Sequence, residues 1–151
     1  MKEKGIGPPV ITAIESLQRL TELFTQRREQ LARGAGLTVA QWEALEQISD
    51  EHFMPSLFAR ERQSTPAAVS KILRQLLDKG LVRSRISRTD GRQRRYRLTA
   101  KGERTMAALR EARQRAIEAI WLDLRPQSLD AFTRFADELI TRLESYAGQR
   151  E

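Results

Sequence analysis

The chain has 151 residues, 40% of them apolar, and a net charge of +7, which fits one ordinary domain with a modest core. It contains no cysteine and one histidine, which excludes disulfides and thiolate metal sites and disfavours a histidine-based enzyme or metal centre. No apolar run approaches the roughly 20 residues of a membrane span, and the first residues lack the apolar stretch of a signal peptide. We therefore expect a cytoplasmic binding protein that makes no contact with a membrane and uses no metal or cofactor.

The first two predicted elements are helices. Apolar residues recur at three- and four-residue intervals over residues 10–31, and two glycines shortly afterwards end that helix. The second helix begins at Thr38, whose side chain can cap it while Gln41 reaches back to complete a capping box. The pattern predicts that this helix runs to about Ser49.

A helix-turn-helix is predicted next. Pro55 fits the first turn of a short helix that runs to Arg62. Thr65, followed by a proline, then marks the N-cap of another helix, which extends to Lys79, and Gly80 supplies the left-handed residue that ends it. The very short break between the two helices is typical of a helix-turn-helix.

Two alternating runs of residues follow and predict a β-hairpin. Asp90-Gly91 marks its turn, inside a loop that covers residues 87–93. If the apolar side chains of both strands share one face, four arginines project from the other face, namely Arg83, Arg85, Arg95 and Arg97. Like charges paired across strands are destabilising, so we expect a phosphate beside the hairpin.

The positive charge of the chain is concentrated in this part of the sequence. Residues 60–97 contain ten arginines and two lysines against three acids, a net charge of +9. Because the planar fork of arginine suits phosphate better than the point charge of lysine, this excess indicates a polyanion as the partner.

Long helices are predicted at both ends of the chain. Thr99 can cap a fifth helix whose apolar residues continue to Leu124, and Pro126 separates it from a sixth helix that reaches about Tyr146. These helices and the first one have no obvious place in a core of only about 65 residues. We therefore expect them to pair with a second copy of the chain.

Four short motifs occur along the chain, each of them once. They are Leu-Thr-x-x-Gln-Trp at residues 37–42, Gly-Leu-Val at 80–82, Asp-Gly-Arg at 90–92 and Leu-Thr-x-x-Gly at 98–102. The helix-turn-helix between the first two carries Leu57, Ala59, Thr65, Val69, Ser70 and Lys71. In this order and at this spacing, the motifs resemble the MarR family of bacterial winged helix-turn-helix regulators over residues 10–147. Arg62, Gln63 and Ser64 depart from the family, in which leucines and a glycine are common around the turn.

The resemblance implies a mainly α (α+β) fold with a two-stranded wing. A winged helix-turn-helix lobe would cover residues 37–99, and residues 8–34 plus 100–147 would form a helical dimerisation region. The implied protein is a homodimer on pseudo-palindromic duplex DNA, whose recognition helix, residues 65–79, enters the major groove.

The resemblance also implies which residues meet DNA. From the recognition helix they are Thr65, Pro66, Ala67, Ala68, Ser70, Lys71 and Arg74, and from the wing Arg88, Arg92, Arg94 and Arg95. The small alanines permit contact with thymine methyls, and Lys71 or Arg74 can reach guanine or phosphate. Arg92 would be the minor-groove arginine, while Asp90 would hold the arginines of the wing in place.

Many members of the family release DNA when a small aromatic or anionic effector binds. Residues suited to such a ligand are Arg19, Phe24, Trp42, His52 and Phe53, because an arginine among aromatic rings suits an aromatic carboxylate. The alternative for the aromatic residues is ordinary packing in the core or the dimer.

We expect a sequence-specific transcriptional regulator, a repressor that a small effector releases from its operator. The alternative is a nonspecific nucleic-acid-binding or architectural protein without effector sensing, which would lack the preference of about 10³ for one DNA site. RNA binding is disfavoured because the strands lack interleaved stacking aromatics. An enzyme is not expected, because the sequence has no phosphate loop, metal cluster or nucleophile–base pair.

Overall fold

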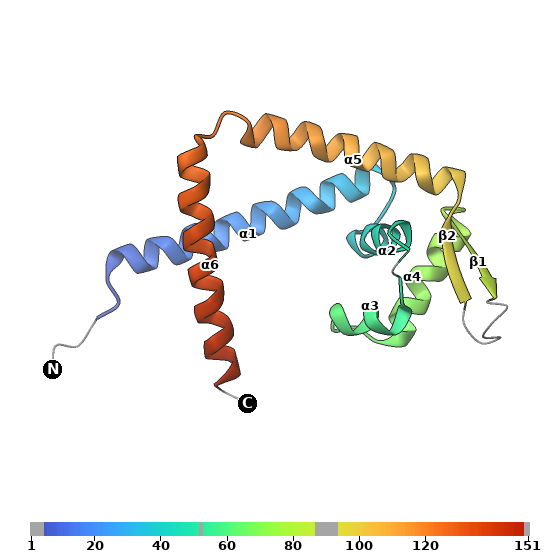
Figure 1. Cartoon of the computed structure of the whole chain (residues 1–151), viewed down its shortest axis with the longest axis horizontal. Helices are drawn as coiled ribbons and strands as arrows, with labels where there is room; N and C mark the ends of the chain where they lie inside the picture. Colours follow the sequence, from blue (N-terminus) through green and yellow to red (C-terminus); the bar gives the residue numbers. More distant parts are fainter. Residues whose placement is uncertain (1–4, 52, 87–93, 150–151) are drawn as a thin grey trace. The chain divides into compact units, whose positions relative to one another are not determined.

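The computed structural model describes residues 5–51, 53–86 and 94–149 (Figure 1). Its elements, in chain order, are α1 (Pro8–Gly34), α2 (Val39–Ser49), α3 (Pro55–Glu61), α4 (Pro66–Asp78), β1 (Val82–Ile86), β2 (Arg94–Leu98), α5 (Ala100–Trp121) and α6 (Pro126–Gly148). This order confirms the predicted mainly α fold with one two-stranded sheet. The chain divides into two compact units, Met1–Ala112 and Arg113–Glu151.

Local sequence signals account for where the helices begin. Thr38 accepts a hydrogen bond from the backbone N–H of Gln41 at 3.1 Å, and the Gln41 side chain accepts one from the backbone N–H of Thr38 at 3.2 Å. Thr65 caps α4 in the same way, since its hydroxyl accepts from the backbone N–H of Ala68 at 3.1 Å. Both predicted caps are therefore confirmed, and α4 begins at the expected residue.

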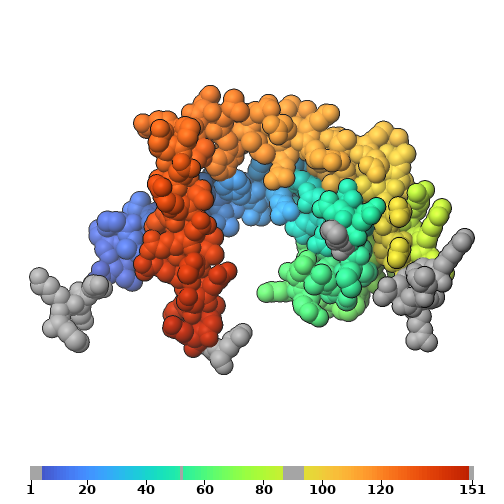
Figure 2. Space-filling model, viewed as in Figure 1, coloured from blue at the N-terminus to red at the C-terminus, as the bar shows by residue number. Residues whose placement is uncertain are grey.

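The core of the first unit lies among α2, α3 and α4. Its most deeply buried large side chains are Phe58, Leu45, Leu76, Leu109 and Val69. Figure 2 shows the atoms of these helices, drawn in teal to green, packed into one body with the yellow strand β2. Because core residues come from every element of the helix-turn-helix and from α5, the position of α4 is fixed by packing on several sides.

The end of α4 leads directly into the wing. Gly80 has a φ of 67°, and the backbone N–H of Leu81 donates to the Leu76 carbonyl at 3.1 Å, which is the expected Schellman ending. On the far side of the wing, the Thr99 hydroxyl accepts from the backbone N–H of Gly102 at 3.1 Å and so caps α5. The same hydroxyl donates to the Gly80 carbonyl at 2.6 Å, which ties the start of α5 to the end of α4.

Strands β1 and β2 pair antiparallel, with Val82 opposite Leu98 and Ser84 opposite Tyr96 on one face. Val82 is buried, and Tyr96 and Leu98 pack against the core. On the other face the four predicted arginines are all exposed, in the pairs Arg83↔Arg97 and Arg85↔Arg95. The predicted division of the hairpin into an apolar and an arginine face is therefore confirmed; its predicted turn, Asp90-Gly91, lies outside the described residues.

The terminal helices carry large apolar side chains that are exposed. In α1 they are Val10, Ile11, Ile14, Leu17, Leu20, Leu23 and Phe24. Considered by itself, α6 has no buried residue, and its exposed apolar residues include Phe132, Phe135, Ile140, Leu143 and Tyr146. α5 ends at Trp121, so Leu124 lies in the turn before α6 rather than in the predicted helix. Within the described residues, no helix is long and apolar enough to span a membrane.

The turn between α3 and α4 has one unusual backbone conformation. Gln63 has a φ of 50°, in the left-handed region that favours glycine.

We expect Gln63→Gly to stabilise the protein by about 0.5–1 kcal/mol. Removing the Cβ relieves about 1–2 kcal/mol of backbone strain, and the greater conformational freedom of glycine in the unfolded chain cancels part of this gain. Urea unfolding measures the change. Ser64→Gly is the control: Ser64 has no positive φ, so glycine at this position should destabilise the protein. Equal changes in the free energy of unfolding for the two variants would contradict the explanation.

Candidate nucleic-acid interface

The helix α4 buries one face and exposes the other. Val69, Leu73 and Leu76 are buried against the core. Of the residues predicted to meet DNA, the exposed ones are Thr65, Pro66, Ala67, Ser70, Lys71 and Arg74, and Ala68 is half-buried. The exposed face combines small side chains with two cations and has no acid in its first turn. It therefore has the chemistry needed to approach a polyanion closely.

A buried glutamine holds α4 in place. The side chain of Gln41 is 3% exposed, and its amide donates to Oε1 of Gln75 on α4 at 2.9 Å. Its oxygen accepts from the Lys79 ammonium at 2.9 Å, in addition to the capping bond with Thr38. Since a buried amide is costly unless it is hydrogen-bonded, these contacts fix where α2 meets α4.

Lys79 also connects the end of α4 to the other helices. Its ammonium donates to the Gly36 carbonyl at 2.7 Å, in the turn between α1 and α2. Lys101 of α5 in turn donates to the Lys79 carbonyl at 2.8 Å. The C-terminal end of α4 is therefore tied to the turn that follows α1 and to the start of α5. Sequence reasoning missed Gln75, Lys79 and Lys101, because no local pattern links residues so far apart in the chain.

The turn of the helix-turn-helix is tied to α1 through one carboxylate. Glu43 on α2 forms an ion pair with Arg28 of α1, with Nη2 and Oε1 3.1 Å apart, and a second ion pair with Arg62. The guanidinium carbons of Arg28 and Arg62 also lie 5.6 Å from the ring centroids of Trp42 and Phe58, respectively. The turn residue Arg62, which departs from the family pattern, is thus engaged within the protein.

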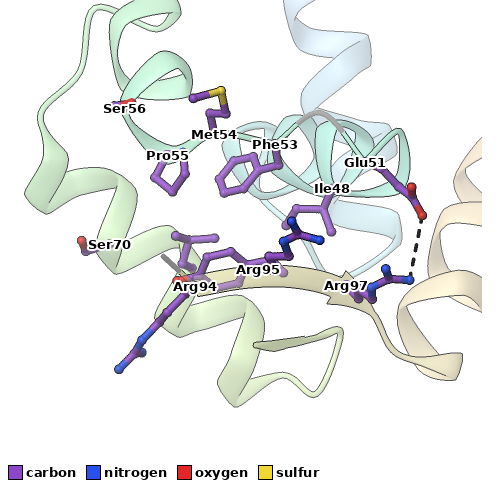
Figure 3. Close-up of a pocket in the computed structure, with 12 residues that line it drawn as sticks. Ile48, Glu51, Phe53, Met54, Pro55, Ser56, Ser70, Arg94, Arg95 and Arg97 are labelled. Carbon is purple, nitrogen blue, oxygen red and sulfur yellow. Dashed lines mark ion pairs between the residues drawn. The ribbon is translucent and has the colours of Figure 1, made fainter. Parts of the chain in front are cut away.

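The wing strand β2 and helix α4 border one pocket of about 700 Å³ (Figure 3). Ser70 and Leu73 of α4 line it on one side, and Arg94, Arg95 and Tyr96 of β2 on another. The end of α2 and the start of α3 complete its wall with Ile48, Glu51, Phe53, Met54, Pro55 and Ser56. The structure thus brings together expected DNA-contacting residues of the helix and of the wing. Arg88, Asp90 and Arg92 lie outside the described residues.

Of the described residues that are expected to bind an effector, only Phe53 lines this pocket. Its ring centroid lies 5.5 Å from that of Phe58 and 5.9 Å from that of Tyr96. Trp42 is buried in the core, while Arg19 and Phe24 are exposed on α1, and His52 lies outside the described residues. The burial of Trp42 agrees with the packing alternative for that residue. Among the residues that the structure describes, no cluster of three or more possible metal ligands occurs.

Comparisons with known proteins give one family. Residues 35–93 match the model of the MarR family. A 76-residue stretch is 33% identical to the HTH-type transcriptional regulator PetP of Rhodobacter capsulatus, and it covers 50% of this chain and 46% of that relative. The chain thus aligns with about half of the length of this relative.

Solved structures agree with the fold across most of the chain. A MarR family transcription regulator matches with a TM-score of 0.80 and 22% identity, covering 92% of this chain and 93% of its own. The MepR–DNA complex of S. aureus matches with a TM-score of 0.65 and 15% identity, covering 93% of this chain and 99% of the MepR chain. AbsC of Streptomyces coelicolor matches with a TM-score of 0.72 and 20% identity, covering 94% and 99%. Residues 35–93 of this chain are therefore similar to the MarR family in sequence, and most of the chain has the fold of solved MarR family structures.

Proposed function

We propose that the protein is a sequence-specific transcriptional regulator that binds duplex DNA as a homodimer, in the cytoplasm of a bacterium. The observation that carries the proposal is the exposed face of α4, with Ser70, Lys71 and Arg74, beside the arginines of β2. The S. aureus relative MepR, solved as a DNA complex, supports it by analogy of fold. A repressor that blocks a pseudo-palindromic operator is the form that we infer.

In this proposal the lobe at residues 37–99 performs the DNA contact. Lys71 and Arg74 reach guanine edges or phosphate, and the small residues from Thr65 to Ala68 let the start of α4 approach the bases. Arg88, Arg94 and Arg95 contact phosphates, Arg92 enters the minor groove, and Asp90 orders the wing. The groove contacts specify the sequence, whereas the phosphate contacts set the position and most of the affinity.

The terminal helices, residues 8–34 and 100–147, form the proposed dimerisation region. The exposed apolar residues of α1, such as Leu17 and Phe24, and those of α6, such as Phe135, support this assignment. Water-exposed apolar side chains in such numbers are costly for a monomer, and a second copy would cover them. Two lobes held at a fixed separation can then read two half-sites about one helical turn apart.

Regulation in this proposal is a coupling free energy between an effector and DNA. A small aromatic or anionic ligand that prefers a dimer geometry unable to match both half-sites weakens DNA binding by that preference. The candidate contacts remain Arg19, Phe24, Trp42, His52 and Phe53. Phe53 has the best support, since it lines a pocket that also contains arginines.

Lys71→Ala tests the proposed reading of bases. The change should weaken binding to a duplex selected from random DNA by about 1–3 kcal/mol and should reduce the preference for that duplex over random sequence. The measurement is affinity for both duplexes at one salt concentration. Arg95→Ala is the matched comparison, because loss of a phosphate contact should weaken both duplexes equally and lower the salt slope by about one. An equal loss on both duplexes for Lys71→Ala would reject a base-reading role.

The alternative of a nonspecific or architectural DNA-binding protein makes the opposite prediction for specificity. It requires the preference for a selected site to fall far below about 10³, whatever the affinity. The match of residues 35–93 to the MarR family supports the expectation that the chain is a regulator and not an enzyme.

A further inference from the structure

One carboxylate on α2 holds two arginines that come from separate parts of the first unit. Oε1 of Glu43 lies 3.1 Å from Nη2 of Arg28 on α1, and Oε2 of Glu43 forms an ion pair with Nη1 of Arg62. Arg62 ends α3 and stands three positions before Thr65, the cap of α4. We call Arg28, Glu43 and Arg62 the Glu43 clamp. Because both carboxylate oxygens are occupied, the orientation of the Glu43 side chain is fixed.

The Arg62 side chain turns toward the protein although it lies in a surface turn. It is 30% exposed, and its guanidinium carbon lies 5.6 Å from the ring centroid of Phe58. Phe58 is buried, and the backbone N–H of Ser64 donates to the Ala59 carbonyl at 2.8 Å, so the turn has a fixed place on the core. The guanidinium is therefore held by a carboxylate and by the face of an aromatic ring, two partners that both favour its positive charge.

Arg62 also lies close to the face of α4 that is proposed to contact DNA. That exposed face begins at Thr65. Three residues of chain span at most about 11 Å, which limits the distance between the Cα atoms of Arg62 and Thr65. An Arg62 side chain released from Glu43 would therefore place its charge near the phosphates that flank α4. A phosphate contact of this kind adds about 0.9 to the salt slope of DNA binding.

We propose that Glu43 withholds Arg62 from DNA, so that the protein makes one phosphate contact fewer than its arginines permit. This inference rests on the proposed function. Glu43 thereby lowers the part of the affinity that depends on salt and not on sequence, while the base contacts of α4 are unaffected. Arg62 stays in the clamp because water and salt screen a surface phosphate more than a carboxylate that is only 25% exposed.

The test is Glu43→Gln, which keeps the size of the side chain and removes its charge. Arg62 should then meet a phosphate, and the salt slope should rise by about 0.9. Relative to 1 M salt, that corresponds to a gain of about fivefold in affinity at 0.15 M salt, equal for a selected duplex and for random duplex DNA. An ion pair that served only the stability of the fold would produce no gain in affinity when it is lost.

Two further variants assign the gain to Arg62. Arg62→Gln in the otherwise unsubstituted protein should leave the salt slope within about half a unit, because Arg62 does not contact DNA there. The double variant Glu43→Gln/Arg62→Gln should return to the slope of the unsubstituted protein. Urea unfolding of each variant verifies that the protein under test is folded.

Glu46→Gln is the matched control for net charge. It removes one negative charge from the same helix, three residues further along α2. The described part of the chain holds no ion pair between Glu46 and an arginine. The salt slope of the Glu46→Gln protein should therefore stay within about half a unit of the unsubstituted value.

Three results would overturn the clamp. They are an unchanged salt slope in folded Glu43→Gln protein, a fall of about 0.9 in Arg62→Gln protein, and an equal rise in the Glu46→Gln control. If Glu43→Gln does not fold, Arg62→Gln decides: a retained slope supports the clamp and a lower slope overturns it. Sequence preference tests the proposed function separately. An unsubstituted protein without that preference would reject the sequence-specific regulator, and a slope that still rises in Glu43→Gln would leave the clamp standing.

Discussion

Gly102→Ala should destabilise the protein by about 3 kcal/mol or more, one of the largest effects of any single methyl group in the chain. A Cβ at this position would lie 2.1 Å from the carbonyl oxygen of Leu81 and 3.1 Å from its carbonyl carbon. That carbonyl cannot move freely, because it accepts a hydrogen bond from the backbone N–H of Thr99 at 3.0 Å. The added methyl group must therefore separate the start of α5 from the end of α4. Unfolding in urea measures the loss.

Gly34→Ala is the control for this experiment. Gly34 ends α1 and has nothing within 4 Å of an added Cβ, so alanine there should be neutral or stabilising by up to about 1 kcal/mol. A Gly102→Ala protein as stable as the unsubstituted one would show that α5 docks on the wing more loosely than the structure indicates.

Phe58→Ala should cost about 3–5 kcal/mol, the range for removing a buried aromatic side chain. Phe58 is 1% exposed at the centre of the helix-turn-helix, and its ring centroid lies 5.5 Å from that of Phe53. Through Phe53 the ring contacts extend to Tyr96 on the wing, so we expect the loss to loosen the wing as well as α3. Since domains are stable by only about 5–15 kcal/mol, this loss is a large share of the free energy of unfolding, and urea unfolding measures it.

Met54→Ala is the matched control for Phe58→Ala. Met54 is 55% exposed, just before α3, so its truncation should change the free energy of unfolding by less than about 1 kcal/mol. Comparable losses in the two variants would mean that the segment between α2 and α3 is packed differently from the structure.

Features that depend on neighbouring residues could be predicted from the sequence. The caps at Thr38, Thr65 and Thr99, the ending at Gly80 and the two faces of the hairpin all occur as expected. Each requires only a few residues close in the chain, and the physical preference acts within one turn or one strand pair.

Features that depend on distant side chains could not be predicted. Gln41 bonds to residues 34 and 38 positions away, and Lys79 reaches a carbonyl 43 positions away. Glu43 binds Arg28 and Arg62 together, so the charge of Arg62 is compensated within the protein. The periodic spacing of apolar residues in the sequence does not predict such contacts, because they depend on how the helices pack against one another. Likewise, the glycine at position 102 belongs to a recognisable motif, but its close approach to Leu81 emerges only in three dimensions.

The central claim is that a dimer of this chain reads a DNA sequence through α4. Selection of bound duplexes from a random-sequence pool at physiological salt, followed by sequencing of the retained DNA, tests this claim most directly. The account predicts enrichment of a pseudo-palindrome with half-sites about one helical turn apart, preferred over random DNA by about 10³ or more. A pool that binds with steep salt dependence but shows no enriched sequence would contradict the claim and would favour a nonspecific DNA-binding protein.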